Sequence, residues 1–176
     1  MAARLRVLTA EDAPAYLEVR LRALREHPEA FATSAEEAAL APLADVARRL
    51  APGPEHVTVG AFDGDRLAGV ATVVRATRAK ERHRATVAAM YVAPEARGRG
   101  LGEALLRRAL DAVRAWGGVT DVGLAVTAGN DGARALYARA GFVSWGVEPR
   151  ALFVDGRHHD TEWMALRLDA EDAERR

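Results

Sequence analysis

The sequence contains no cysteine among its 176 residues. This absence excludes disulfide bonds, thiolate metal sites and a cysteine nucleophile. The chain also has no excess of either charge, because Lys and Arg together number 25 and so do Asp and Glu. A net charge of zero gives no overall field that would attract nucleic acid or a membrane surface, so any charge preference must be local.

Long apolar runs are missing as well. Residues 1–6 have no long apolar core, and no later stretch approaches the ~20 residues that a membrane-spanning helix needs. We therefore expect a soluble cytoplasmic protein. The length and the 49% hydrophobic content suffice for one well-cored domain, and no repeat or linker divides the chain. We predict a single domain over residues 1–176, with a charged tail at 169–176 that frays.

Apolar periodicity predicts a mixed order of strands and helices. Strands are expected at residues 5–7, 57–62, 67–75, 85–92, 119–126, 142–147 and 163–168, and helices at 12–27, in one or two pieces over 29–49, at 103–116 and at 130–140. Antiparallel hairpins come first and a βαβ unit follows, which favours an α/β (α+β) fold around one mixed sheet. Residues 149–160 are predicted to form a loop with Asp155-Gly156 at its turn.

A glycine-rich loop follows the strand at 85–92 and opens a helix. Gly98, Gly100 and Gly102 stand at alternate positions in this loop. Bare N–H groups in such a loop converge on an anion, and the helix start adds unpaired donors and a partial positive charge. The pattern therefore predicts a pyrophosphate cradle. A glycine-rich turn without a ligand stays open on the local pattern alone.

Two common phosphate-binding motifs do not fit this loop. A nucleotide-hydrolase phosphate loop needs Lys and then Ser or Thr after its last glycine, where Glu103 and Ala104 stand. The dinucleotide fingerprint needs Gly or Ala where this chain has Glu103 or Leu105, depending on the starting glycine.

Two motifs resemble the signatures of the GNAT superfamily of N-acetyltransferases. Arg97, Gly100 and Gly102 fill the places of the acetyl-CoA signature Arg/Gln-x-x-Gly-x-Gly/Ala. Residues 130–142 are similar to the second signature, Asn-x-x-Ala-x-x-Leu-Tyr followed by Gly-Phe. The resemblance covers residues 57–168 closely and the N-terminal region loosely. It implies a GNAT-like sheet, mixed and mostly antiparallel, that is splayed between its fourth and fifth strands to receive acetyl-CoA.

The resemblance also implies a set of acetyl-CoA contacts. The open edge of the fourth strand would pair with the two amides of the pantetheine arm, and the glycine loop would wrap the pyrophosphate. Positive charge beside the phosphates would come from the two loop arginines, although surface solubility is the alternative for both. The full predicted set is Met90, Tyr91, Val92, Arg97, Gly98, Arg99, Gly100, Leu101, Gly102 and Asn130.

Tyr137 stands at the position of the family's general acid, where its phenol would protonate the leaving thiolate. A core tyrosine is the alternative. Without cysteine, direct attack of a neutral amine on the thioester is the simplest route. Backbone N–H groups from the bulged end of the strand near residues 90–92 would stabilise the developing oxyanion.

The general base is not identified by the sequence. Some relatives carry a glutamate on the central strand, but residues 85–92 contain no acid. The candidates elsewhere are Glu36, Glu37, Glu81, His83, Glu148, His158 and His159, or an ordered water. For each of these side chains a solvated surface position is the alternative. Adjacent histidines on a strand point to opposite faces and no third ligand is evident, so we expect no metal.

We therefore expect an acyltransferase that moves an acetyl group from acetyl-CoA to an amine of a small molecule or peptide. The alternative is a module that holds CoA or acyl-CoA without turnover, as a sensor or assembly subunit. The N-terminal helices and the loop at 149–160 would select the acceptor, with Glu36, Glu37 and Glu148 forming an acidic pocket for a cationic amine. No basic groove with interleaved aromatics is present, so nucleic acid is not an expected partner. Oligomeric state is left open, with a homodimer the commonest assembly.

Overall fold

A computed structural model describes residues 3–168, and the predicted frayed tail at 169–176 lies outside the described residues. The strands are β1 (Arg4–Val7), β2 (His56–Asp63), β3 (Arg66–Arg75), β4 (Arg84–Val92), β5 (Asp121–Thr127), β6 (Val143–Val154) and β7 (Arg157–Arg167). The α-helices are α1 (Ala13–Glu26), α2 (Ala35–Ala39), α3 (Leu43–Leu50), α4 (Leu101–Ala115) and α5 (Asp131–Arg139). Among the described residues, none of the helices is both long and apolar enough to cross a membrane.

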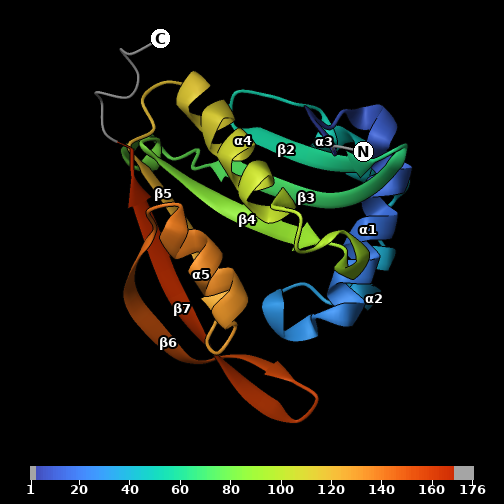
Figure 1. Ribbon diagram of the computed structural model, residues 1–176. Coiled ribbons are helices and arrows are strands. Elements are labelled where there is room, and N and C mark those ends of the chain that lie inside the picture. The colour runs from blue at the N-terminus through green and yellow to red at the C-terminus, as the bar shows by residue number, and fades with distance from the viewer. Residues whose placement is uncertain (1–2, 169–176) are drawn as a thin grey trace.

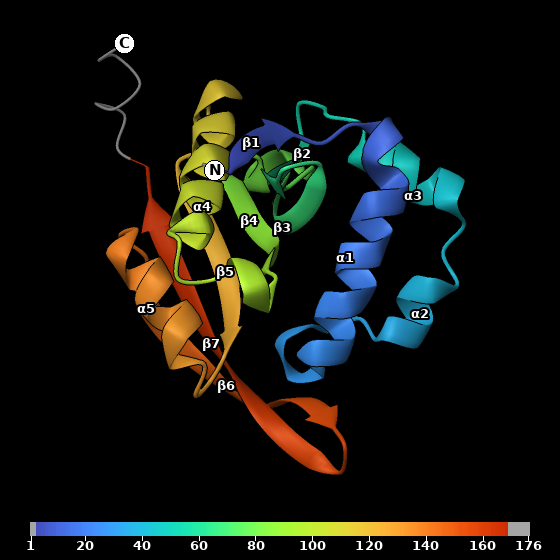
Figure 2. The same cartoon turned by 45° about the vertical axis from the view of Figure 1, so that its right-hand side comes forward.

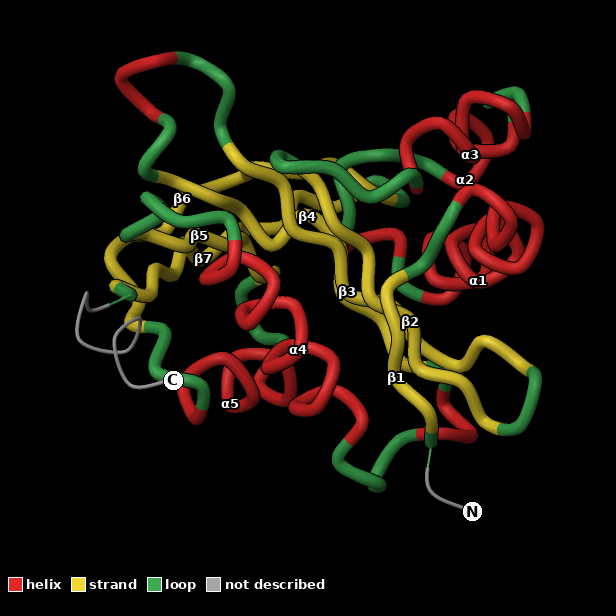
Figure 3. The backbone as a smooth tube through the Cα atoms, turned by 90° about the horizontal axis from the view of Figure 1, so that it is seen from above, coloured by secondary structure: helices red, strands yellow, loops and turns green. Residues whose placement is uncertain are grey.

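The strands form one mixed sheet in the order β1-β2-β3-β4-β5-β7-β6 (Figure 1). Only β4 and β5 pair in parallel, and every other neighbouring pair is antiparallel. Helices α4 and α5 lie on one face of the sheet, and α1, α2 and α3 lie on the other (Figure 3). The α/β fold class predicted from the sequence is therefore confirmed.

Each face of the sheet carries its own apolar core. Leu105 and Leu106 of α4 are completely buried against Val59 on one face. On the other face, Val19 of α1 and Leu50 of α3 pack in a second cluster. Two cores are possible because the central strands are covered on both sides, which is why their sequences are almost continuously apolar.

The segment at 149–160 differs from the prediction, because it forms a hairpin instead of a loop. Strand β6 continues to Val154 and β7 begins at Arg157, with the turn at Asp155-Gly156 where the sequence placed it. Pro149 does not end β6, since β6 is the edge strand and the pairing register shifts between Glu148 and Leu152. Proline is tolerated at such a bulge on an edge, where no ladder donor is needed. The hairpin extends as an arm from the body (Figure 2).

The sheet splits between β4 and β5, as predicted. The two strands pair from Arg84 with Asp121 to Val87 with Leu124 and no further. Beyond that point β4 stays paired with β3, whereas β5 stays paired with β7. Figure 1 shows β4 and β5 diverging from their shared end. The edge of β4 from residue 88 onward therefore faces the gap.

A β-bulge at Ala88 sets which side chains face this gap. Thr72 of β3 stands opposite Ala89 and the next residue of β3 stands opposite Val87, so Ala88 is the extra residue. An extra residue reverses the alternation of a strand. Val87 and Met90 accordingly contact the same core, beneath α4, although they are an odd number of residues apart. The bulge was expected near residues 90–92 and lies instead at 88.

Candidate active site

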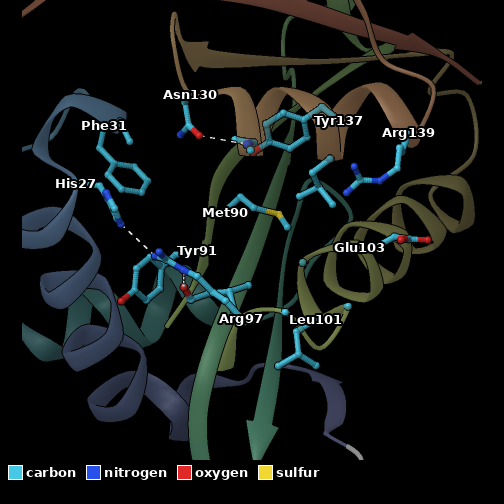
Figure 4. Close-up of a pocket in the computed structure, with 18 residues that line it drawn as sticks. His27, Phe31, Met90, Tyr91, Arg97, Leu101, Glu103, Asn130, Tyr137 and Arg139 are labelled. Carbon is cyan, nitrogen blue, oxygen red and sulfur yellow. Dashed lines mark hydrogen bonds between the residues drawn. The ribbon is translucent and has the colours of Figure 1, made fainter. Parts of the chain in front are cut away.

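A cavity of about 640 Å³ opens along the splayed edge of β4. It lies between the start of α4, helix α5 and the 3-10 turn η2 (Pro28–Ala30) (Figure 4). The structure brings together here all but one of the predicted site residues: Met90, Tyr91, Val92, Arg97, Gly98, Gly100, Leu101, Gly102, Asn130 and Tyr137. Residues from two distant parts of the chain therefore share one cavity.

The glycine loop presents backbone donors to this cavity. Gly98 and Gly100 both have a φ of 73°, a left-handed conformation that favours glycine, and Gly100 is the N-cap of α4. Among the described residues, no acceptor is recorded for the amides of Gly98, Gly100, Leu101 or Gly102. Unpaired amides at a helix N-terminus favour a bound anion.

The two loop arginines are placed differently. The Nε of Arg97 donates to the carbonyl oxygen of Val92 at 2.9 Å, and its Nη2 lies 3.1 Å from Nε2 of His27. Arg97 is thereby held at the cavity wall. Arg99 is the predicted site residue that does not line the cavity, because its Nη1 donates to Asp63 at 2.8 Å. A contact between Arg99 and a phosphate stays a prediction, and it requires Arg99 to leave Asp63.

Tyr137 extends from α5 toward the gap between β4 and β5 (Figure 4). Its side chain is only 7% exposed, and its ring meets Phe142 edge-on at a centroid distance of 6.0 Å. Burial raises the pKa of Tyr137 to about 12. The ring of Tyr137 thus belongs to the core, which was the alternative to a general acid. Its hydroxyl makes no hydrogen bond to another described residue. At neutral pH this hydroxyl is a protonated, available donor.

Asn130 has a structural task at the cavity. Its side-chain oxygen accepts a hydrogen bond from the backbone N–H of Ala133 at 3.1 Å, which caps α5 (Figure 4). This cap fixes the start of the helix that carries Tyr137.

The seven candidate bases are scattered. Glu81 and His83 lie in the connection before β4, at the strand end remote from the split, and Glu148 accepts a hydrogen bond from Trp163. Glu36 is exposed on α2, His158 contacts Arg150 at 2.6 Å in the hairpin arm, and His159 follows it on β7. Only Glu37 lines a cavity that touches the bulge of β4. Of Glu36, Glu37 and Glu148, Glu37 alone lines this cavity, and an acidic pocket of all three stays a prediction.

Several cavity residues were not predicted from the sequence. His27 and Phe31 line the main cavity from the N-terminal side. His56 and Glu37 together line the cavity that touches the bulge of β4. Local sequence assigned His27, Phe31 and His56 no role at the site, since their positions depend on how α1 and β2 pack against the sheet.

Comparisons with known proteins agree with this architecture. Residues 18–142 match the family model described as the acetyltransferase (GNAT) family. The N-alpha-acetyltransferase RimI of Mycobacterium tuberculosis is 40% identical over 103 residues, which cover 58% of this chain and 62% of that protein. This match thus spans less than two thirds of the relative's length.

Solved structures share the fold over nearly the whole chain. A phosphinothricin acetyltransferase from Sinorhizobium meliloti in complex with AcCoA has a TM-score of 0.80 and 27% identity, covering 96% of this chain and 89% of that one. A GNAT acetyltransferase from Streptococcus pneumoniae has a TM-score of 0.80 and 21% identity, covering 94% and 99%.

The fold and cavity define a mixed-sheet protein with a glycine-rich loop of backbone donors beside a splayed strand. The family model covers well over half of the chain, so this protein belongs to the GNAT family of acetyltransferases. The resemblance given by the two sequence motifs is confirmed.

Proposed function

We propose that this protein transfers the acetyl group of acetyl-CoA to an amine by direct attack. The observation that carries the proposal is the open edge of β4, which begins after the Val87–Leu124 pair. This edge leads into a loop where the amides of Gly98, Gly100, Leu101 and Gly102 have no acceptor among the described residues. An open strand edge suits the amides of a pantetheine arm, and the loop suits a pyrophosphate. Structures with a similar fold hold acetyl-CoA, which supports this ligand.

The residues of the cavity have separate tasks in this proposal. The backbone of residues 90–92 orients the arm, and the amides of the loop from Gly98 to Gly102 hold the pyrophosphate. A backbone N–H at the open edge donates to the carbonyl oxygen as negative charge develops there. Tyr137 donates a proton to the sulfur as it departs. A pKa of about 12 keeps the phenol protonated at neutral pH.

The reaction balances without a covalent enzyme species. The carbon–nitrogen bond forms as the carbon–sulfur bond breaks, the sulfur takes a proton from Tyr137, and the amine loses one to a base or water. The Tyr137 phenolate then regains a proton from solvent, which restores the enzyme. Glu37 and water are the base candidates that the cavity beside the bulge supports. The acceptor class is a peptide amine or a small-molecule amine, since similar proteins are described as acting on both kinds.

Thiol release from acetyl-CoA tests the proposal. We expect release with at least one member of a panel of peptides, amino acids, polyamines and aminoglycosides, and an increase in melting temperature with CoA. The alternative, a CoA-binding sensor or assembly module, predicts the same stabilisation without thiol release. No stabilisation at CoA concentrations far above a micromolar Kd would contradict both functions.

A homodimer and a cytoplasmic location stay predictions. Val143, Trp145 and Val147 belong to the edge strand β6 and are 68%, 66% and 56% exposed, with Trp145 at a bulge in the pairing with β7. An exposed apolar edge supports pairing with a second copy. Sedimentation velocity of Trp145→Glu against the unchanged protein tests this, and equal masses for both would remove β6 as the interface.

A further inference from the structure

A second cavity, of about 280 Å³, lies between the sheet and helices α1, α2 and α3. Ala88 and Ala89 of β4 form part of its wall, and the same two residues line the small cavity in the gap between β4 and β5. Tyr137 lines that small cavity too. The second cavity therefore ends at the place where the acetyl group would be transferred, on the face opposite α4.

Arg20 and Arg49 both line this cavity without an ion pair to a described residue, but Arg49 donates to the carbonyl oxygen of Asp45 and Arg20 has no such partner. The guanidinium carbon of Arg20 lies 4.5 Å from the centroid of the Phe31 ring, and Phe31 lines the gap. Among the described residues, Arg20 makes no side-chain hydrogen bond and no ion pair. A ring face satisfies none of the five N–H donors of a guanidinium.

Burial makes this arrangement costly for the free protein. Arg20 is partly buried, and burial lowers its pKa from the usual range. By contrast, Arg6 and Arg22 on the same side of the molecule are paired with Asp12 and Glu95. An unpaired, partly buried guanidinium that faces a cavity is a preformed site for an oxyanion.

His56 adds a second donor to the same wall. Its Nδ1 is buried and has no hydrogen-bond partner, and burial lowers the pKa of the imidazole. A buried N–H group without an acceptor costs more free energy than a buried nitrogen lone pair without a donor. We therefore place the proton of the neutral imidazole on Nε2 and the lone pair on Nδ1. His56 thus presents a donor to the cavity. Glu37, the one acid of this wall, is held by the backbone N–H of Ser34 at 2.8 Å.

We propose that this cavity binds the oxyanion of a small acceptor, an amino-acid-like amine with a carboxylate or phosphonate, through Arg20 and His56. The amine then points past Ala88 and Ala89 toward the acetyl group. The assignment rests on the proposed function and names its acceptor class. A polyamine is disfavoured because it brings like charge to Arg20. A peptide amine is disfavoured because its carboxylate is remote from the reacting nitrogen.

Matched acceptor pairs test the assignment. The substrates are free L-amino acids with their carboxamides, and 1-aminoalkylphosphonates, which separate carboxylate from phosphonate recognition. We expect the acids to have the higher kcat/KM. Arg20→Gln is expected to lower kcat/KM about 10- to 100-fold for the acids, mainly through KM, and to leave the carboxamides and the KM for acetyl-CoA unchanged. Arg20→Lys should retain part of the effect, since it keeps the charge without the fork.

Arg25→Gln is the control, because Arg25 is exposed on the same helix and does not line the cavity. The assignment would be overturned if carboxamides or peptides had a kcat/KM equal to that of the acids. It would also be overturned if Arg20→Gln lowered kcat/KM equally for the acids and the carboxamides. Calorimetric titration of an acid into the protein with CoA provides a readout without turnover. Binding that depends on Arg20 without any thiol release would keep the oxyanion site and reject acetyl transfer.

Discussion

Val87 of β4 stands opposite Leu124 of β5 in the last parallel pair before the two strands separate. Both side chains are buried, with exposures of 7% and 1%, so the apex of the gap is apolar and closed. The bulge at Ala88 follows immediately. The residues of β4 up to Val87 therefore pair with β5, and those from Ala88 onward leave an edge free for a ligand.

Acetyl-CoA should protect the open edge of β4 from hydrogen exchange. Antiparallel pairing with β3 occupies only one edge of residues 88–92, so the outward amides have no strand partner within residues 3–168. We expect exchange of this segment to slow when acetyl-CoA binds, as measured by mass spectrometry. Residues 84–87 are the internal control, since β5 already pairs with them. Slow exchange at 88–92 in the free protein would contradict an open edge.

Gly100→Ala should weaken acetyl-CoA binding about tenfold or more. An alanine is strained in the left-handed conformation of this residue, and the backbone shift that relieves the strain displaces the amides that hold the phosphates. Gly64→Ala is the matched control. Gly64 also has a positive φ, 62°, with nothing near its missing side chain, and it lies in the turn between β2 and β3. Both variants should lose about 1–2 kcal/mol of stability. Calorimetry should show weaker binding for Gly100→Ala alone, and equal affinities would remove the loop from the site.

Tyr137→Phe should lower kcat by about 100-fold or more and leave acetyl-CoA affinity unchanged, because it removes the proton donor and keeps the ring. Phe142→Leu is the control for packing, since Phe142 contacts the Tyr137 ring. That variant should lose stability with a much smaller loss of kcat. Steady-state thiol release measures both, and full activity of Tyr137→Phe would reject the general acid.

Alkaline pH should destabilise the unchanged protein more than Tyr137→Phe. The pKa of Tyr137 is about 12 in the folded protein against 10.0 as its ordinary value. Above pH 10 the unfolded chain releases this proton first, so stability present below pH 10 is lost as the pH rises to 12. The difference in free energy of unfolding between the two proteins should change by about 2–3 kcal/mol over this interval. Urea titrations at pH 9 to 12 measure it, and a constant difference would contradict the buried phenol.

Local sequence was sufficient wherever a few neighbouring residues fix the backbone. The glycine loop, the Asn130 cap and the Asp155-Gly156 turn were all found, because each depends on residues within a few positions. The extent of β6 was not predicted, because a proline usually ends a strand. Pro149 is tolerated within β6 only because it lies at a bulge on the edge of the sheet.

The second cavity illustrates what local sequence does not contain. Arg20 and His56 are 36 positions apart on α1 and β2, and neither stands in a motif. Whether an arginine lies in solvent or above a phenylalanine ring depends on how the helix packs, which no spacing rule describes.

The sequence by itself determined the family, the order of elements and the loop that presents backbone donors, because these follow from short-range pattern and glycine conformation. Only the tertiary structure decided where β4 leaves β5, which arginine of the loop faces the cavity, and which charges surround the acceptor side. Those features depend on strand register and helix packing between distant segments, where one extra residue at Ala88 redirects the side chains that follow it.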